Sequence, residues 1–179
     1  MLYMFYAQGF EEVEAIATLD VIRRGGIEIK SVSVGDKIIT GSHGIPVVCD
    51  ITDNEIPFDS VDGVILPGGM PGTNNLFNSE TIHKAVDYCD ANGKLICAIC
   101  AAPLILGRKG LLAGKEAVCF PGFEDELKGA SISSKYVCVD GNIITAKGMG
   151  ASFDFGFLIV EYLKGKDTAL KIREGIFAK

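Results

Sequence analysis

Short apolar segments alternate with amphipathic segments along almost the whole chain. Brief apolar runs bounded by Gly, Pro, Asn or Asp are typical of buried strands, and apolar residues at helical spacing are typical of amphipathic helices. The pattern predicts strands at Leu2–Ala7, Ile27–Val34, Val61–Leu66, from Leu95 onward, Ala117–Phe120, Tyr136–Val139 and Ile143–Thr145.

Helices are predicted between these strands. The first covers Glu11–Arg24, and its apolar positions near helical spacing are Val13, Ile16, Ala17, Leu19 and Ile22. Another follows the capping residues Asn78-Ser79-Glu80, and two more cover Ser152–Lys164 and Asp167–Glu174. A hairpin is expected within Ile38–Asp50. Strands that alternate with helices predict an α/β three-layer sandwich, a mostly parallel sheet with helices on both faces.

The strand that begins at Leu95 ends abruptly at Cys100, and a helix that starts with Ala101-Ala102-Pro103 follows without a linker. Such a strand-to-helix turn displays its residue at the carboxyl edge of the sheet, where backbone N–H groups converge on it. The partial positive charge at the start of a helix also favours the thiolate of a cysteine. Cys100 is therefore the first candidate nucleophile.

Two plainer interpretations of Cys100 compete with this one. It is one of six cysteines, and most of the others stand in apolar segments typical of core thiols. Cys97 and Cys100 also form a C-x-x-C pair, but a dithiol exchange site is disfavoured because Cys97 lies inside the predicted strand. The position of Cys100 at a strand end, before small residues, favours a reactive role.

Composition and charge limit the classes of function. The chain has 179 residues, 48% of them apolar, which suits a single compact domain over residues 1–179. A net charge of −6 without a basic block disfavours a nucleic-acid or membrane partner. The apolar start of the chain is too short for a signal peptide or a membrane span, so we expect a cytoplasmic protein with free thiols. Zinc is disfavoured because Cys97 and Cys100 lack a second pair of ligands at the required spacing.

Glu14 is the second candidate for chemistry. It lies in a largely apolar stretch, unlike Glu11 and Glu12, which suit a solvated first helical turn. Burial at the sheet edge would raise the pKa of its carboxyl group, so that a protonated Glu14 could donate a hydrogen bond to a thiolate and later transfer a proton. A surface position for Glu14 is an equally open alternative.

A glycine-rich loop, Leu66-Pro67-Gly68-Gly69-Met70-Pro71-Gly72, follows another strand. It lacks both the G-x-G-x-x-G pattern and the lysine of a phosphate-binding loop, so no nucleotide cofactor is expected. A backbone N–H in this loop could stabilise negative charge on a substrate oxygen, although a tight turn explains the glycines equally well. Of the two histidines, His83 is expected to be solvated, and His43 either lines the mouth of a site or is an ordinary loop residue.

Four collinear motifs resemble the DJ-1/ThiJ/PfpI superfamily, and its DJ-1-like branch most closely. They are Gly9-Phe10-Glu11-Glu12-Val13-Glu14, Leu66-Pro67-Gly68-Gly69, Ala98-Ile99-Cys100-Ala101-Ala102-Pro103 and Gly148-Met149-Gly150-Ala151-Ser152-Phe153-Asp154-Phe155. The resemblance implies a flavodoxin-like sandwich, similar to class I glutamine amidotransferases, and a homodimer. It also implies a nucleophilic Cys100, a protonated Glu14, and oxyanion donors at the backbone N–H groups of Gly69 and Ala101, without a metal or cofactor.

The same resemblance implies that the site is lined by Gly68, His43, Phe120, Gly148 and Met149. The activities it implies are conversion of glyoxal or methylglyoxal to hydroxy acids, as a glyoxalase, and removal of early glycation adducts, as a deglycase. Alternatives within the superfamily are an oxidative-stress sensor or chaperone, whose cysteine becomes a sulfinate, and a role labelled as thiazole biosynthesis.

Three positions depart from the patterns of the superfamily. Phe120 stands where many relatives have a histidine, so a histidine proton shuttle is missing and the site is more apolar. Ala101 replaces the histidine of the protease-like branch, which disfavours peptidase activity. His43 stands where DJ-1-like relatives often carry an arginine, so anion recognition can differ. We therefore expect a glyoxalase-like enzyme that acts on small 2-oxoaldehydes through Cys100 and Glu14.

Overall fold

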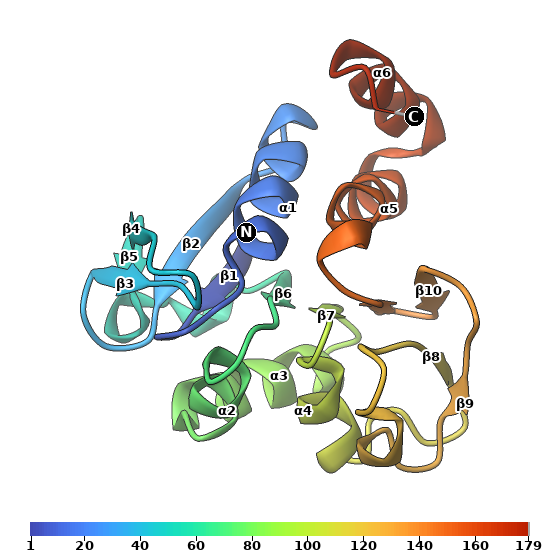
Figure 1. Ribbon diagram of the computed structural model, residues 1–179. Coiled ribbons are helices and arrows are strands. Elements are labelled where there is room, and N and C mark those ends of the chain that lie inside the picture. The colour runs from blue at the N-terminus through green and yellow to red at the C-terminus, as the bar shows by residue number, and fades with distance from the viewer. Residues whose placement is uncertain (179) are drawn as a thin grey trace.

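The computed structural model describes residues 1–178, which are organised around a seven-stranded sheet (Figure 1). The strand order is β10-β11-β7-β6-β1-β2-β5. The strands are β1 Leu2–Tyr6, β2 Ile29–Ser33, β5 Ile51–Thr52, β6 Gly63–Leu66, β7 Leu95–Ile99, β10 Val137–Asp140 and β11 Ile143–Ala146. Neighbouring strands pair in parallel except β10 and β11, which are antiparallel. The predicted mostly parallel sheet is confirmed.

Helices cover both faces of this sheet (Figure 1). On one face lie α1 Glu12–Arg24 and α5 Ser152–Lys164, with α6 Lys166–Gly175 packed on α5; on the other face lie α2 Gly72–Phe77, α3 Glu80–Ala91 and α4 Pro103–Arg108. The side chains of β1 alternate between the two cores: Met4 and Tyr6 pack on the α1 side, and Tyr3 and Phe5 on the α3 side. This arrangement confirms the flavodoxin-like three-layer sandwich. No helix within residues 1–178 has the length and apolar character needed to cross a bilayer.

The buried face of α1 differs from the one that the apolar spacing indicated. Val13 and Ile16 are 42% and 41% exposed, whereas the buried residues are Glu12, Glu14, Ala15, Thr18, Val21 and Ile22. The rotation of α1 is set by its close contact with α5, where a Cβ added to Gly156 would lie 2.9 Å from Val21 Cβ. In this orientation the first turn of α1 directs two carboxyl groups inward and leaves two apolar side chains in solvent.

Two further segments compare differently with their predictions. The hairpin is confirmed: β3 Ile38–Thr40 pairs antiparallel with β4 Pro46–Val48. The strand predicted over Ala117–Phe120 is wrong for most of its length, since β8 covers only Glu116–Ala117 and pairs with β9 Ser131–Ile132. The N–H of Val118 donates to Thr145 Oγ1 and that of Phe120 donates to the carbonyl of Cys100. These amides therefore hold the segment against neighbouring loops instead of extending a ladder.

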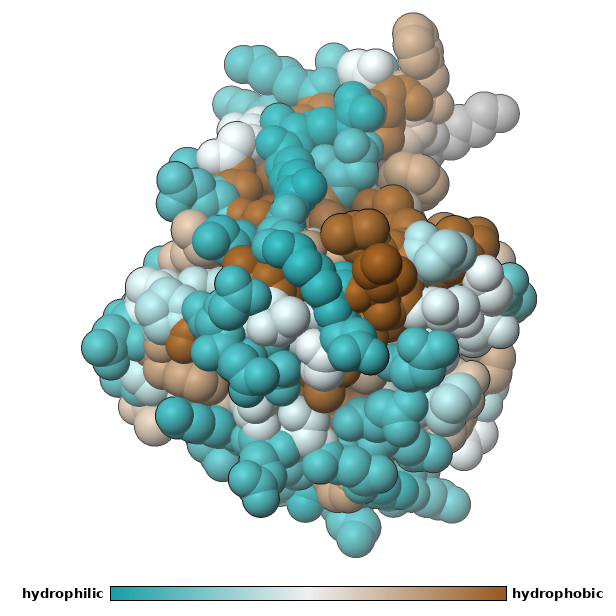
Figure 2. All heavy atoms as spheres, turned by 90° about the vertical axis from the view of Figure 1, so that its left-hand side faces the viewer, coloured by the Kyte–Doolittle hydropathy of each residue, from teal (hydrophilic) through white to brown (hydrophobic). Residues whose placement is uncertain are grey.

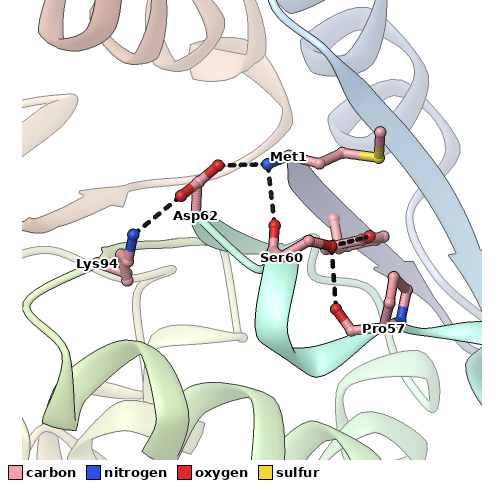
Figure 3. A network of polar contacts seen from close by, with 6 residues as sticks. Met1, Pro57, Ser60, Asp62 and Lys94 are labelled. Atoms are coloured by element: carbon pink, nitrogen blue, oxygen red, sulfur yellow. Dashed lines mark hydrogen bonds and ion pairs between the residues drawn. The ribbon is translucent and has the colours of Figure 1, made fainter.

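A polar network lies at the amino-terminal edge of the sheet (Figure 3). The ammonium group of Met1 contacts the Ser60 carbonyl at 3.0 Å and the carboxylate of Asp62, and Lys94 Nζ donates to the same carboxylate at 2.9 Å. Hydrogen bonds from the ammonium group and from Lys94 lower the pKa of Asp62. Cys100 directly follows the end of β7 and therefore lies at the opposite edge of the sheet from this network.

Candidate active site

The sharp turn predicted at Cys100 is present between β7 and α4. Cys100 has a φ of 65°, a left-handed conformation that typically costs a non-glycine residue about 1–2 kcal/mol. Two hydrogen bonds hold it there: the Cys100 N–H donates to the Ala146 carbonyl at 2.9 Å, and the Phe120 N–H donates to the Cys100 carbonyl at 2.8 Å. The turn places Cys100 at the carboxyl edge of the sheet.

Gly68 brings the loop after β6 between the thiol and a carboxyl group. Its N–H donates to Glu14 Oε2 at 2.8 Å, and the Glu11 N–H donates to the Gly68 carbonyl at 2.9 Å. A Cβ added to Gly68 would lie 2.5 Å from Cys100 Cβ and 2.7 Å from Glu14 Oε2. A larger residue would therefore force Cys100 and Glu14 apart, which explains the glycine in physical terms.

Glu14 is almost completely buried, with 1% of its surface exposed, which excludes the surface alternative. Burial raises its pKa to about 7, against the opposing effect of hydrogen bonds from Cys100 and from the Gly68 N–H. Glu14 Oε1 has no well-aligned hydrogen-bond partner among the described residues. A buried carboxyl oxygen beside a thiol is a suitable position for the proton of a neutral carboxyl group.

Cys100 is partly buried, and its pKa is raised, opposite to the direction expected from the sequence. Burial and the negative charge of Glu14 raise the pKa to about 12, whereas the N–H groups of Gly69 and Ala101 lower it. Since the two groups interact, they titrate as a pair that loses its first proton near neutral pH and its second far above it. In the singly ionised pair, the Gly69 and Ala101 N–H groups stabilise charge on sulfur, whereas the Gly68 N–H stabilises charge on Glu14, the group with the lower pKa.

The other five cysteines are all buried and unpaired, and Cys100 alone among the six is partly accessible. Cys97 is fully buried, and burial raises its pKa well above the ordinary value. A resolving thiol at Cys97 would be out of reach of a substrate. The C-x-x-C spacing therefore does not form a dithiol exchange site.

His43 lies at the hairpin turn and pairs with Glu12. Its Nδ1 is 2.9 Å from Glu12 Oε2, and its backbone N–H donates to Glu12 Oε1 at 2.7 Å. Glu11, Glu12 and His43 also place potential metal ligands within 4.8 Å of one another. Glu12 is already hydrogen-bonded to His43, and Glu11 accepts from the Glu14 N–H as the N-cap of α1, so these groups act in the structure as a clamp between hairpin and helix.

His83 is not the solvated residue that its sequence context suggested. It is half-buried, its Nε2 is 2.6 Å from the Phe77 carbonyl, and its ring contacts the Phe77 ring edge-on. It joins the end of α2 to α3, far along the chain from the site residues. The sequence pattern did not predict α2, so it could not indicate that Phe77, the last residue of α2, is the partner of His83.

A hollow of about 300 Å³ is lined by two segments whose backbones are hydrogen-bonded to Cys100 at Phe120 and at Ala146, although Cys100 is not itself a lining residue. Its lining includes three of the expected site residues, Phe120, Gly148 and Met149, the last from the short helix η4 Met149–Ala151. It also includes Tyr136 and Lys147, which sequence reasoning missed; Lys147 directly precedes the glycine motif, whereas nothing in the sequence marks Tyr136. A larger hollow of about 720 Å³ lies at the amino-terminal edge of the sheet, bordered by Met1 and Lys94, and is remote from Cys100.

Comparisons with known proteins identify the family and agree with the fold. The sequence profile of the DJ-1/PfpI family matches residues 2–162. The chain is 38% identical to Protein DJ-1 homolog B of Arabidopsis thaliana over 169 residues, 93% of this chain but 39% of that protein, so it spans about two fifths of the plant protein's length. A Caenorhabditis elegans protein named glutathione-independent glyoxalase is 31% identical over 159 residues, which cover 88% of this chain and 84% of that protein.

A solved structure shares the whole fold. The crystal structure of a mutant DJ-1 superfamily protein from Salmonella typhimurium superposes with a TM-score of 0.94 at 35% identity, over 99% of this chain and 98% of that one. Because the family profile covers nearly the whole chain and the fold agrees along its length, the chain belongs to the DJ-1/PfpI family.

Proposed function

We propose that this protein is a cofactor-free glyoxalase-like enzyme that converts small 2-oxoaldehydes to 2-hydroxy acids. The observation that carries the proposal is a buried carboxyl group, Glu14, with a pKa of about 7 beside the accessible thiol of Cys100. The N–H groups of Gly69 and Ala101 act on the same sulfur. The name of the Caenorhabditis elegans relative supports this class of reaction.

The first step forms a bond between the Cys100 sulfur and the aldehyde carbon. Glu14 accepts the proton of the Cys100 thiol, and the sulfur contributes the electron pair. The carbonyl electrons move to oxygen, where the Gly69 and Ala101 N–H groups stabilise the charge. Glu14 donates its proton to that oxygen and becomes a carboxylate. The product is a hemithioacetal, and Glu14 is then ready to act as a base.

The second step moves a proton between the two adjacent carbons. The Glu14 carboxylate removes the proton from the former aldehyde carbon and returns it to the former ketone carbon, while the proton of the hemithioacetal hydroxyl moves to the former ketone oxygen. The first carbon is thereby oxidised to a thioester and the second is reduced to an alcohol. Water then breaks the carbon–sulfur bond and releases the 2-hydroxy acid. The overall reaction adds one water and needs no external oxidant; early glycation adducts of the same aldehydes are further candidate substrates.

The test is lactate formation from methylglyoxal by purified protein. We expect Cys100→Ser and Glu14→Gln to lower kcat by about 10²-fold or more, because nucleophilic and acid–base assistance are each lost. Cys138→Ser is the matched control, since a serine can replace the bond from the Cys138 thiol to the Glu116 carbonyl and should keep the wild-type rate. Equal rates for wild type and Cys100→Ser would overturn the proposal.

A second candidate function is redox sensing through Cys100. The observation that favours it is that Cys100 alone among the six cysteines is partly accessible, beside a carboxyl group able to donate to a sulfinate. Mild peroxide, as the oxidant, would then add two oxygens to this sulfur. Selective oxidation of Cys100 by mass spectrometry, combined with no aldehyde turnover, would favour the sensor over the enzyme.

We also propose a homodimer formed through the exposed apolar face of α1. Val13 and Ile16 project from this face, and the hairpin beside it exposes Ile45 and Val48. The two parts are joined where the Ser42 N–H donates to the Phe10 carbonyl at 2.8 Å. Figure 2 shows strongly apolar side chains gathered on the side of the molecule that carries the hairpin. A second copy of the chain is the expected occupant of this surface.

A further inference from the structure

The hollow next to the Cys100 turn has mainly apolar walls. Its largest apolar side chains are those of Phe120, Tyr136 and Met149, which are 48%, 66% and 53% exposed. Aromatic rings and a thioether favour contact with another aromatic ring. Among the lining residues that the structure describes, Lys147 alone is charged, and its Nζ lies 5.7 Å from the centre of the Tyr136 ring. The lining therefore suits an aromatic ring of a ligand better than a charged group of a ligand.

Backbone hydrogen bonds join the walls of the hollow to Cys100, the candidate nucleophile. Phe120, on one wall, donates its N–H to the Cys100 carbonyl at 2.8 Å. The Cys100 N–H donates to Ala146, the residue before Lys147 on the opposite wall. The Phe120 ring lies over Gly148, where an added Cβ would be 3.2 Å from it. Each wall of the hollow is therefore within one residue of a segment that is hydrogen-bonded to the Cys100 backbone, which places the hollow next to the turn that carries the reacting sulfur.

We infer that the preferred substrate is a 2-oxoaldehyde whose ketone carbon carries an aromatic ring, which binds in this hollow while the aldehyde carbon reacts with Cys100. The inference rests on the proposed function and narrows its substrate class. The chemistry is the same internal oxidation and reduction: phenylglyoxal and water give mandelate, as methylglyoxal and water give lactate. The ring adds buried apolar area near the reacting atoms, which methylglyoxal lacks.

The test compares kcat/KM for phenylglyoxal and methylglyoxal in the same protein. We expect the wild type to prefer phenylglyoxal by about tenfold or more, a range typical of an apolar pocket. Phe120→Ala and Tyr136→Ala should each lower this ratio several-fold. Tyr162→Ala removes an exposed tyrosine at the other end of the sheet and should leave the ratio unchanged.

The outcomes separate the inference from the proposed function. Cys100-dependent turnover of methylglyoxal with no preference for phenylglyoxal, or a preference unaffected by Phe120→Ala and Tyr136→Ala, overturns the aromatic subsite and leaves the proposed function standing. Absence of turnover with both aldehydes overturns the proposed function.

A binding measurement decides the subsite without turnover. In calorimetric titrations with the two product acids, we expect mandelate to bind about tenfold more tightly than lactate, and Phe120→Ala to remove the difference. Equal affinities, or no binding of either acid because a second copy covers the hollow, would count against the subsite.

Discussion

At the scale of single residues, two features of the candidate site cost free energy of folding. Glu14 is a carboxyl group with 1% of its surface exposed, and Cys100 has a left-handed backbone conformation. Burial raises the pKa of Glu14 to about 7 from an ordinary value of 4.5. Such a group would be replaced by an apolar one if only stability mattered, so we interpret the burial as a requirement of the chemistry.

The raised pKa of Glu14 makes stability depend on pH in a definite direction. Between the unfolded and folded pKa values the folded state binds more protons, so the contribution is present below about pH 4.5 and is lost as pH rises through about 7. Glu14→Gln removes this titration and retains an acceptor for the Gly68 N–H. We expect the stability of the variant relative to wild type to be about 2–3 kcal/mol more favourable near pH 8 than near pH 5.

Urea unfolding at the two pH values measures this difference. Glu28→Gln, which changes an exposed glutamate, is the control. The difference in free energy of unfolding between this variant and the wild type should be the same at both pH values. A Glu14→Gln effect that does not vary with pH would contradict the assignment of a raised pKa.

At the scale of elements, the buried side chain of Glu12 holds the hairpin β3–β4 against α1. The buried carboxylate of Glu12 accepts hydrogen bonds from the His43 N–H at 2.7 Å and the Ile45 N–H at 3.4 Å. Burial would raise the pKa of Glu12, but these bonds and that of the His43 ring together lower it. The carboxylate also fills the space beside Gly41, where an added Cβ would lie 2.3 Å from it. Glu12, which lies two residues before Glu14 in α1, therefore fixes the position of the hairpin.

We expect Glu12→Ala to destabilise this clamp because the two hairpin N–H groups lose a charged acceptor. The cost should be about 1–3 kcal/mol, and hydrogen exchange at the amides of His43 and Ile45 should become faster. Asp20→Ala, which removes an exposed ion pair with Arg24 on the same helix, is the control and should cost less than about 1 kcal/mol. Unchanged exchange at both amides would show that the hairpin is held by other contacts.

At the scale of the whole molecule, the packing of the helix layers leaves apolar side chains of α1 exposed. The rotation of α1 that buries Glu12 and Glu14 also exposes Val13 and Ile16, so the geometry of the site and the exposed face have one cause. Specific dimers bury about 800 Å² per subunit with an apolar centre. The α1 face, with the hairpin beside it, is the surface we propose for that role.

We expect the wild-type protein to sediment as a dimer and Ile16→Glu to sediment as a monomer, because a charge at the centre of the interface would be buried without a partner. Ile132→Glu, at an exposed apolar position on β9, should leave the dimer intact. Sedimentation velocity at matched concentrations measures both. A monomeric wild type, or a dimer that tolerates Ile16→Glu, would contradict the proposed surface.

The amino-acid sequence by itself determined the α/β architecture and the turn at Cys100. Apolar runs and glycine breaks are local signals, and an abrupt change from a strand to small residues and Pro103 can be recognised without knowing any distant contact. The tertiary structure alone decided that Glu14 is buried, because the rotation of α1 depends on its packing against Gly156 of α5. It also decided the raised pKa of Cys100 and the aromatic hollow, since burial and the approach of Tyr136 to Phe120 depend on segments far apart in the sequence.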